Sequence, residues 1–224
     1  SVALRAEVCA RFGVRHAFLT CTGRAGMTLL LKAMRRLAAA HRDEVILPSY
    51  TCYSVAASIV KAGLRPRIVD ISPDTLDYAP AELAKADYSR VLAIIATNLY
   101  GLPNDLPTLS RVARDQGVFL IDDAAQAMGA SVGGRLSGAW GDAGLFSFDK
   151  GKNVSAVDGG VVVTSSDDVA RALDRELSLL QPPGIAASGL HVAMALAYFA
   201  MLRPWLYGIP ARIPQLGLGK TVFT

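Results

Sequence analysis

The sequence has few cysteines, few histidines and no long run of charge, and each of these shortages excludes a class of protein. Its three cysteines, none in a C-x-x-C pair, exclude a disulfide-stapled scaffold and favour a reducing compartment. With only three histidines, we predict no metal site. Charged residues make up 19% of the chain and hydrophobic residues 52%, which excludes disorder as the main state. The first residues do not resemble a signal peptide, so we expect a cytoplasmic protein.

The charge balance is mild and dispersed. The 23 lysines and arginines exceed the 19 acidic residues by four, and the basic residues are scattered without interleaved aromatics. A nucleic-acid-binding surface requires clustered basic residues, so we expect no nucleic acid partner. A diffuse positive field suits small anionic ligands.

Segments typical of strands and helices alternate along the chain, which predicts an α/β fold of three layers, α/β/α, with a mostly parallel sheet covered on both faces. Such sheets bind ligands beyond the carboxyl ends of their strands. The predicted strands are 43–48, 66–71, 91–97, 118–122, 143–148 and 159–164, and the predicted helices are 23–40, 54–62, 106–116 and 166–180.

The last part of the chain differs from the rest, so we divide it into a large domain, 1–180, and a segment, 181–224. Residues 184–202 contain no Asp, Glu, Lys or Arg. Their number is near the lower limit of a membrane span, ~17–25 residues. We expect a buried or partner-covered helix here and membrane contact only as the alternative. The loop-like residues after Pro210 indicate a cut rather than a natural terminus.

A turn rich in small residues, 20–26 (TCTGRAG), follows the apolar run 16–19 and opens a predicted helix. The free N–H groups and the dipole of a helix N-terminus suit a phosphate, which makes Gly23 and Arg24 candidate phosphate-binding residues. The alternative is an ordinary strand–helix turn capped by threonine, because the segment matches neither common phosphate-loop pattern.

Two adjacent carboxylates, Asp122 and Asp123, follow the buried strand VFLI, and Gln126 comes three residues later. In an extended chain the two carboxylates face opposite sides of the sheet. A buried carboxylate needs a cation or hydrogen-bond donors, so Asp123 is a candidate to face a protonated ring nitrogen, a basic side chain or a metal. Gln126 would share its face if a helix begins there. The alternative is that either aspartate only caps a helix.

The segment 146–153 (FSFDKGKN) combines a hydroxyl, two phenyl rings and a lysine. If it is extended, Ser147 faces a crevice while Phe146 and Phe148 enter the core. Lys152 follows in a glycine-containing loop, where a lysine amine is a candidate for Schiff-base chemistry. The alternative for Lys152 is a solvated surface side chain.

In this order the motifs resemble the DegT/DnrJ/StrS-type aminotransferases, which use pyridoxal phosphate and act on sugars. The resemblance extends to about residue 180 and is most specific between Asp123 and Gly160. The matching motifs are TGRA (22–25), DEVILP (43–48), GLRPRIVD (63–70), YGLP (100–103), DAAQA (123–127), FSFDKGKN (146–153) and DGG (158–160).

The resemblance implies the large domain of a fold-type-I pyridoxal-phosphate enzyme and a role for each candidate. Lys152 resembles the lysine that binds the cofactor as a Schiff base and then moves protons. Asp123 resembles the carboxylate paired with the pyridinium nitrogen, and Gln126 the residue beside the ring hydroxyl. Ser147 and the backbone of Gly23–Arg24 resemble the phosphate-binding cup.

The implied reaction moves an amino group from an amino acid, expected to be glutamate, to a keto sugar attached to a nucleotide, as in the synthesis of polysaccharides or secondary-metabolite sugars. Family members are homodimers with a smaller C-terminal domain, which we expect this sequence to lack. One alternative is sugar dehydration, but dehydratases usually carry histidine at the position of Lys152. The other is a non-catalytic binding or regulatory protein.

Three positions depart from the family pattern. Cys52 stands where an aromatic often stacks on the cofactor, and Tyr53 follows it. Arg24 replaces a usual threonine, which removes a hydroxyl donor but keeps the N–H group. Asn98 stands where histidine is common.

Overall fold

The computed structural model describes residues 2–181, 184–201 and 203. The chain divides into two compact units, Ser1–Leu180 and Gln181–Thr224. The proposed roles of the two parts, a cofactor-binding domain and the start of a further domain, remain predictions.

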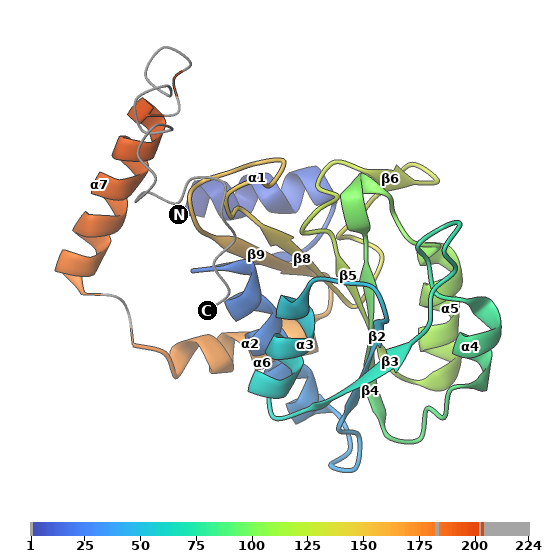
Figure 1. The fold of residues 1–224 in the computed structure, drawn as a ribbon. Helices are drawn as coiled ribbons and strands as arrows, with labels where there is room; N and C mark the ends of the chain where they lie inside the picture. Colours follow the sequence, from blue (N-terminus) through green and yellow to red (C-terminus); the bar gives the residue numbers. More distant parts are fainter. Residues whose placement is uncertain (1, 182–183, 202, 204–224) are drawn as a thin grey trace. The chain divides into compact units, whose positions relative to one another are not determined.

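The first unit contains a seven-stranded sheet in the order β1-β9-β8-β5-β4-β2-β3 (Figure 1). Neighbouring strands from β8 to β3 are parallel, whereas β9 pairs antiparallel with both β8 and β1, so β9 alone is reversed. The strands are β1 (His16–Thr20), β2 (Glu44–Pro48), β3 (Arg65–Val69), β4 (Val91–Thr97), β5 (Phe119–Asp123), β8 (Ala143–Ser147) and β9 (Gly160–Thr164). A separate two-stranded hairpin joins β6 (Ser131–Val132) to β7 (Arg135–Leu136).

Helices cover both faces of this sheet and make the three layers (Figure 1). One apolar cluster joins the sheet to α2 (Gly23–Leu37), α3 (Tyr53–Lys61) and α6 (Asp167–Ser178). On the other face, α4 (Pro80–Lys85) and α5 (Leu106–Gln116) pack against β4 and β5, and α1 (Val2–Phe12) packs against β1, β8 and β9. The predicted three-layer α/β/α fold is therefore confirmed.

The core explains why the strands hold their places. All seven residues of β4 are buried, as expected for a central parallel strand with helices on both sides. Phe146 of β8 is fully buried and its ring centroid lies 4.4 Å from that of Phe12. Leu145 belongs to the opposite cluster, so successive β8 side chains alternate between the two faces, as the sequence predicts.

Several element boundaries differ from the prediction. The helix predicted over 23–40 ends at Leu37, because Ala38 adopts an extended conformation. The helix predicted over 166–180 covers 167–178, with Ser166 as its N-cap. Sequence patterning did not predict α1, α4 or the β6–β7 hairpin. In α1 only Val8 and Phe12 are buried, so the helix presents a narrow apolar stripe to the sheet.

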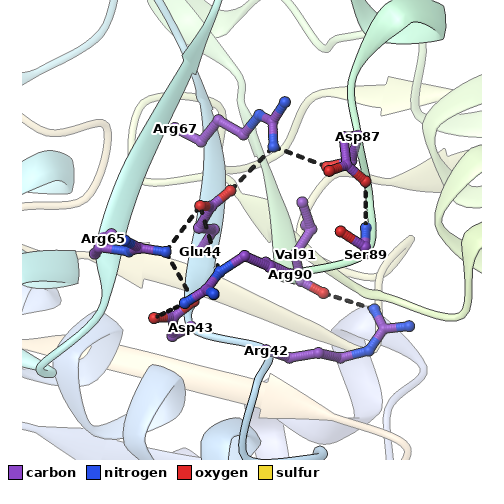
Figure 2. A network of polar contacts seen from close by, with 9 residues as sticks. All are labelled: Arg42, Asp43, Glu44, Arg65, Arg67, Asp87, Ser89, Arg90 and Val91. Atoms are coloured by element: carbon purple, nitrogen blue, oxygen red, sulfur yellow. Dashed lines mark hydrogen bonds and ion pairs between the residues drawn. The ribbon is translucent and has the colours of Figure 1, made fainter.

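A charged network holds the amino ends of β2, β3 and β4 (Figure 2). Arg90 contacts both oxygens of Asp43 at 2.9 and 2.7 Å. Arg65 and Arg67 each donate to Glu44 at 3.0 Å. The Arg90 hydrogen bond, followed by the nearby charges of Arg65 and Arg90, lowers the pKa of Asp43 despite some desolvation. These contacts lie at the edge of the sheet opposite the strand ends considered below.

The second unit contains α7 (Ile185–Met201), a helix without a charged residue. Large apolar side chains along it are exposed, including Leu190 at 63% and Phe199 at 67%. The predicted helix is present, and the cover of its side chains by the rest of the chain or by a partner stays a prediction. Within the described ranges, no helix has the length and apolar character needed to cross a bilayer.

Candidate active site

The candidate residues come from separate strands and meet at one edge of the sheet. Parallel strands end on the same side, so Asn98 after β4, Asp123 at the end of β5 and Ser147 at the end of β8 share this edge. The reversed strand β9 begins there, since Gly160 pairs with both Thr20 and Ser147. The carboxyl end of the sheet therefore brings together most of the residues that the sequence singled out.

Two glycines allow an unusually close approach of backbone segments. A Cβ added to Gly23 would lie 3.0 Å from the Cβ of Ser147 and 3.2 Å from its Oγ. A Cβ added to Gly160 would lie 2.7 Å from the nitrogen of Gly23 and from the carbonyl carbon of Thr22. Glycine at both positions lets the start of α2 sit directly against β8 and β9. Ser147 and Gly23, far apart in the sequence, are thus neighbours.

The first turn of α2 is built to present N–H groups. Thr22 is the N-cap, and its hydroxyl accepts from the Ala25 nitrogen at 3.0 Å. The first main-chain hydrogen bond of the helix runs from Gly26 to the Thr22 carbonyl. The N–H groups of Gly23 and Arg24 precede this bond, so they are placed to bind an anion together with the helix dipole.

Asp123 is buried on the α2 side of the sheet, whereas Asp122 lies on the opposite side, as extended geometry predicts. The Asp123 Oδ1 accepts from the Ala125 nitrogen at 3.1 Å. The residues that follow, 124–129, form turns rather than a helix. Desolvation raises the pKa of Asp123 to about 6, against the lowering effects of the Ala125 hydrogen bond and of the Lys152 charge. A buried carboxylate of this kind calls for a cationic partner.

Lys152 lies in the turns that follow β8, and its main-chain nitrogen donates to the Asp149 carbonyl at 3.1 Å. Its side chain is partly buried, and its charge acts on Asp123. This position disfavours a freely solvated surface lysine. We call Lys152, Asp123 and the Gly23–Ser147 contact the cradle. Its amine, its carboxylate and its helix N–H groups are the kinds of group that suit the carbonyl, the ring nitrogen and the phosphate of pyridoxal phosphate.

Gln126 is held by the loop after β4 rather than by a helix. Its Oε1 accepts from the Tyr100 nitrogen at 3.3 Å. Tyr100 has φ of 55° and ψ of 23°, a left-handed conformation unusual for a residue with a side chain. Gln126 therefore lies next to the 98–104 loop, and its place depends on a locally strained residue.

Sequence patterns did not predict a buried hydrogen-bonded pair in this site. Asn98 and Asp122 are each 0% exposed, and the Asn98 Nδ2 donates to the Asp122 Oδ1 at 2.7 Å. The segments 98–101 and 122–123 stood out as polar groups past strand ends, but residues 24 positions apart give no sequence signal of pairing.

The exposed rim of the site carries further aromatic groups. The hydroxyls of Tyr50 and Tyr100 lie 2.6 Å apart and join the loops after β2 and β4. Cys52 is the N-cap of α3 and is exposed, and Tyr53, the first residue of that helix, is 45% exposed. Tyr53 rather than Cys52 therefore supplies an aromatic ring at this end of α3.

The model of the DegT/DnrJ/EryC1/StrS aminotransferase family matches residues 2–192. The chain belongs to this family. One relative is a UDP-N-acetyl-3-dehydro-alpha-D-glucosamine 3-aminotransferase from Acidithiobacillus ferrooxidans, 38% identical over 172 residues. That alignment covers 76% of this chain and 46% of the relative.

Two solved structures show the same fold. DesI, determined with its TDP-sugar product, is 38% identical with a TM-score of 0.70, over 77% of this chain and 43% of DesI. A GDP-4-keto-6-deoxymannose-3-dehydratase with a trapped PLP-glutamate geminal diamine is 26% identical with a TM-score of 0.69, over 77% of this chain and 45% of the dehydratase. The predicted fold-type-I architecture is thereby confirmed. The chain spans less than half the length of these proteins.

Proposed function

We propose that this chain is the cofactor-binding part of a pyridoxal-phosphate-dependent aminotransferase that moves an amino group from an amino acid to a nucleotide-linked keto sugar. The observation that carries the proposal is the meeting of Lys152, the buried Asp123 and the Gly23–Ser147 contact at one edge of the sheet. The expected donor is glutamate and the expected assembly is a homodimer, both from the family resemblance.

The cradle residues have separable tasks. Gly23 and Arg24 would bind the phosphate through their N–H groups, with the Ser147 hydroxyl beside them. Asp123 would hold the ring through its protonated nitrogen. A cation at that point lowers the pKa of a buried carboxyl, so binding would leave Asp123 ionised.

When bound, pyridoxal phosphate supplies a reactive carbonyl and a ring that takes up an electron pair. The Lys152 Nζ would hold the cofactor at its carbonyl carbon, with the carbonyl oxygen leaving as water. Once the amine of the amino acid displaces it, the Lys152 amine would carry a proton between donor and acceptor carbons.

The presence of lysine at position 152, where dehydratases usually carry histidine, favours amino transfer over sugar dehydration. A dehydratase is nevertheless among the structural neighbours. The two reactions differ in product, since only amino transfer leaves nitrogen on the sugar. Mass spectrometry of a nucleotide keto sugar incubated with protein and glutamate distinguishes them.

The first test is an absorbance titration with pyridoxal phosphate. Wild-type protein is expected to develop a visible band that borohydride bleaches, and Lys152→Ala is expected to lack it. Lys150→Ala is the matched control, because Lys150 lies two positions away in the same loop and is exposed. Absence of the band from folded wild-type protein, or an equal band in Lys152→Ala, would contradict the proposal.

A further inference from the structure

We propose that the buried Asn98–Asp122 pair is the positioning element of this site, because it fixes the main chain that presents Asp123 and Gln126. This inference rests on the proposed function for what those two residues bind. The positioning itself is a property of the chain and can be tested without any ligand.

Every polar group of the Asn98 side chain is used. Its Nδ2 donates to the Asp122 Oδ1 at 2.7 Å and to the Asp123 carbonyl at 3.0 Å, and its Oδ1 accepts from the Asn104 nitrogen at 2.9 Å. The main-chain nitrogen of Asn98 also donates to the Asp123 carbonyl, at 3.1 Å. Asn98 thus joins the end of β4 to the main chain of Asp123.

Asp122 extends the connection to a third segment. Its Oδ2 accepts from the nitrogens of Gly138 at 2.6 Å and Trp140 at 3.1 Å. Burial raises the pKa of Asp122, while the hydrogen bonds from Trp140, Asn98 and Gly138 and the charge of Arg135 lower it. With Asp123 as a further neighbouring carboxylate, Asp122 is the acceptor around which three backbone segments are arranged.

The link to Gln126 runs through Tyr100. The bond from Asn104 to Asn98 closes the 98–104 loop, within which Tyr100 has its left-handed conformation. Such a conformation persists only where the surroundings impose it. If the closure is lost, Tyr100 can relax to negative φ, and its nitrogen then leaves the Gln126 Oε1.

Neither member of the pair can contact a ligand, because both are 0% exposed. They act through Asp123 and Gln126 and are therefore positioning residues. Any effect on ligand binding must come from displaced main chain.

The test compares Asn98→Ala and Asp122→Asn with Tyr78→Phe as the matched control. The Tyr78 hydroxyl donates to the Ile95 carbonyl of β4 at 2.7 Å and is buried, so its loss removes one buried hydrogen bond from the same strand away from the site. All three variants are expected to lower the melting temperature, which therefore does not distinguish them.

The deciding readout is amide hydrogen exchange in ligand-free protein. In Asn98→Ala we expect exchange at Tyr100 and Asn104 to rise about tenfold or more, and in Asp122→Asn the same at Gly138 and Trp140. Tyr78→Phe leaves these amides near wild type. Exchange at these amides that matches the control would overturn the proposal.

An exchanged pair, Asn98→Asp with Asp122→Asn, sharpens the test. It restores a donor–acceptor contact between positions 98 and 122 with total charge unchanged, but it sets a carboxylate against the Asp123 carbonyl. Protection at Asn104, Gly138 and Trp140 is expected to return, and pyridoxal phosphate binding is not. If protection does not return, the contact between positions 98 and 122 is not the cause of the faster exchange in the single variants.

A second readout addresses the ligand. In Asn98→Ala we expect the dissociation constant for pyridoxal phosphate to rise about tenfold. Tyr78→Phe should leave the dissociation constant unchanged, although it loses stability. A wild-type protein without the band would refute the proposed function, while the exchange results would still decide the positioning.

Discussion

Gly160 is the position where a single methyl group tests the cradle most directly. A Cβ there would lie 2.7 Å from the Gly23 nitrogen and the Thr22 carbonyl carbon, and 2.8 Å from the Gly23 Cα. Ordinary contacts begin at about 3.5 Å, so β9 and the start of α2 must separate by about 0.8 Å. All three obstructing atoms are backbone, which no side-chain rotation can move.

The size of the effect of Gly160→Ala follows from two opposing contributions. Overpacking costs about 1–3 kcal/mol, whereas alanine recovers about 0.4–1 kcal/mol from the unfolded chain, so unfolding free energy should fall by about 1–2 kcal/mol. For a chain of this size that is a melting temperature lower by about 2–8 °C. Because the separation occurs at the candidate phosphate site, pyridoxal phosphate affinity should fall about tenfold or more.

Circular dichroism melting and absorbance titration measure the two effects. Gly189→Ala is the control, because a Cβ added there meets nothing within 4 Å and the residue lies inside α7. The control should melt no lower than wild type. Wild-type stability and affinity in Gly160→Ala would refute the close approach of β9 to α2.

Three further predictions concern charge and packing. The pKa of Asp123, raised to about 6 by burial, makes ligand-free protein lose stability as pH rises from about 4 to 6, by about 3 kcal/mol from this group. Urea unfolding at several pH values should show that Asp123→Asn lacks this fall of unfolding free energy with pH. Parallel plots of unfolding free energy against pH for the variant and wild type would contradict the prediction. Asp43→Asn should lower the melting temperature at low salt, with a smaller difference in 1 M NaCl, because salt screens its contact with Arg90; an unchanged difference would argue against the ion pair. Phe146→Ala should lower unfolding free energy by about 3–5 kcal/mol in denaturant titration, since its ring is fully buried against Phe12; a loss under about 1 kcal/mol would contradict this packing.

The fold class could be predicted from sequence because its signals are local. The apolar run 91–97 becomes the fully buried β4, and the amphipathic segment after Thr22 becomes α2. Both patterns depend on residues a few positions apart, which is the range over which periodicity acts. Patterning did not predict α1, because its contacts with the sheet involve few residues.

The candidate site divides in the same way. The sequence alone nominated Lys152, Asp123, Gln126, Ser147 and the Gly23–Arg24 turn, since each lies in a short motif next to a strand end. Only the tertiary structure brings Ser147 against Gly23 and places the Lys152 charge near Asp123.

The Asn98–Asp122 pair shows the physical reason for this limit. A hydrogen bond between residues 24 positions apart depends on which strands become neighbours, and β4 lies beside β5 only once the sheet has formed. The sequence by itself therefore determined most of the helices and strands and the residue types of the candidate site. The order of the strands decided which of those residues meet and which buried groups hold them there.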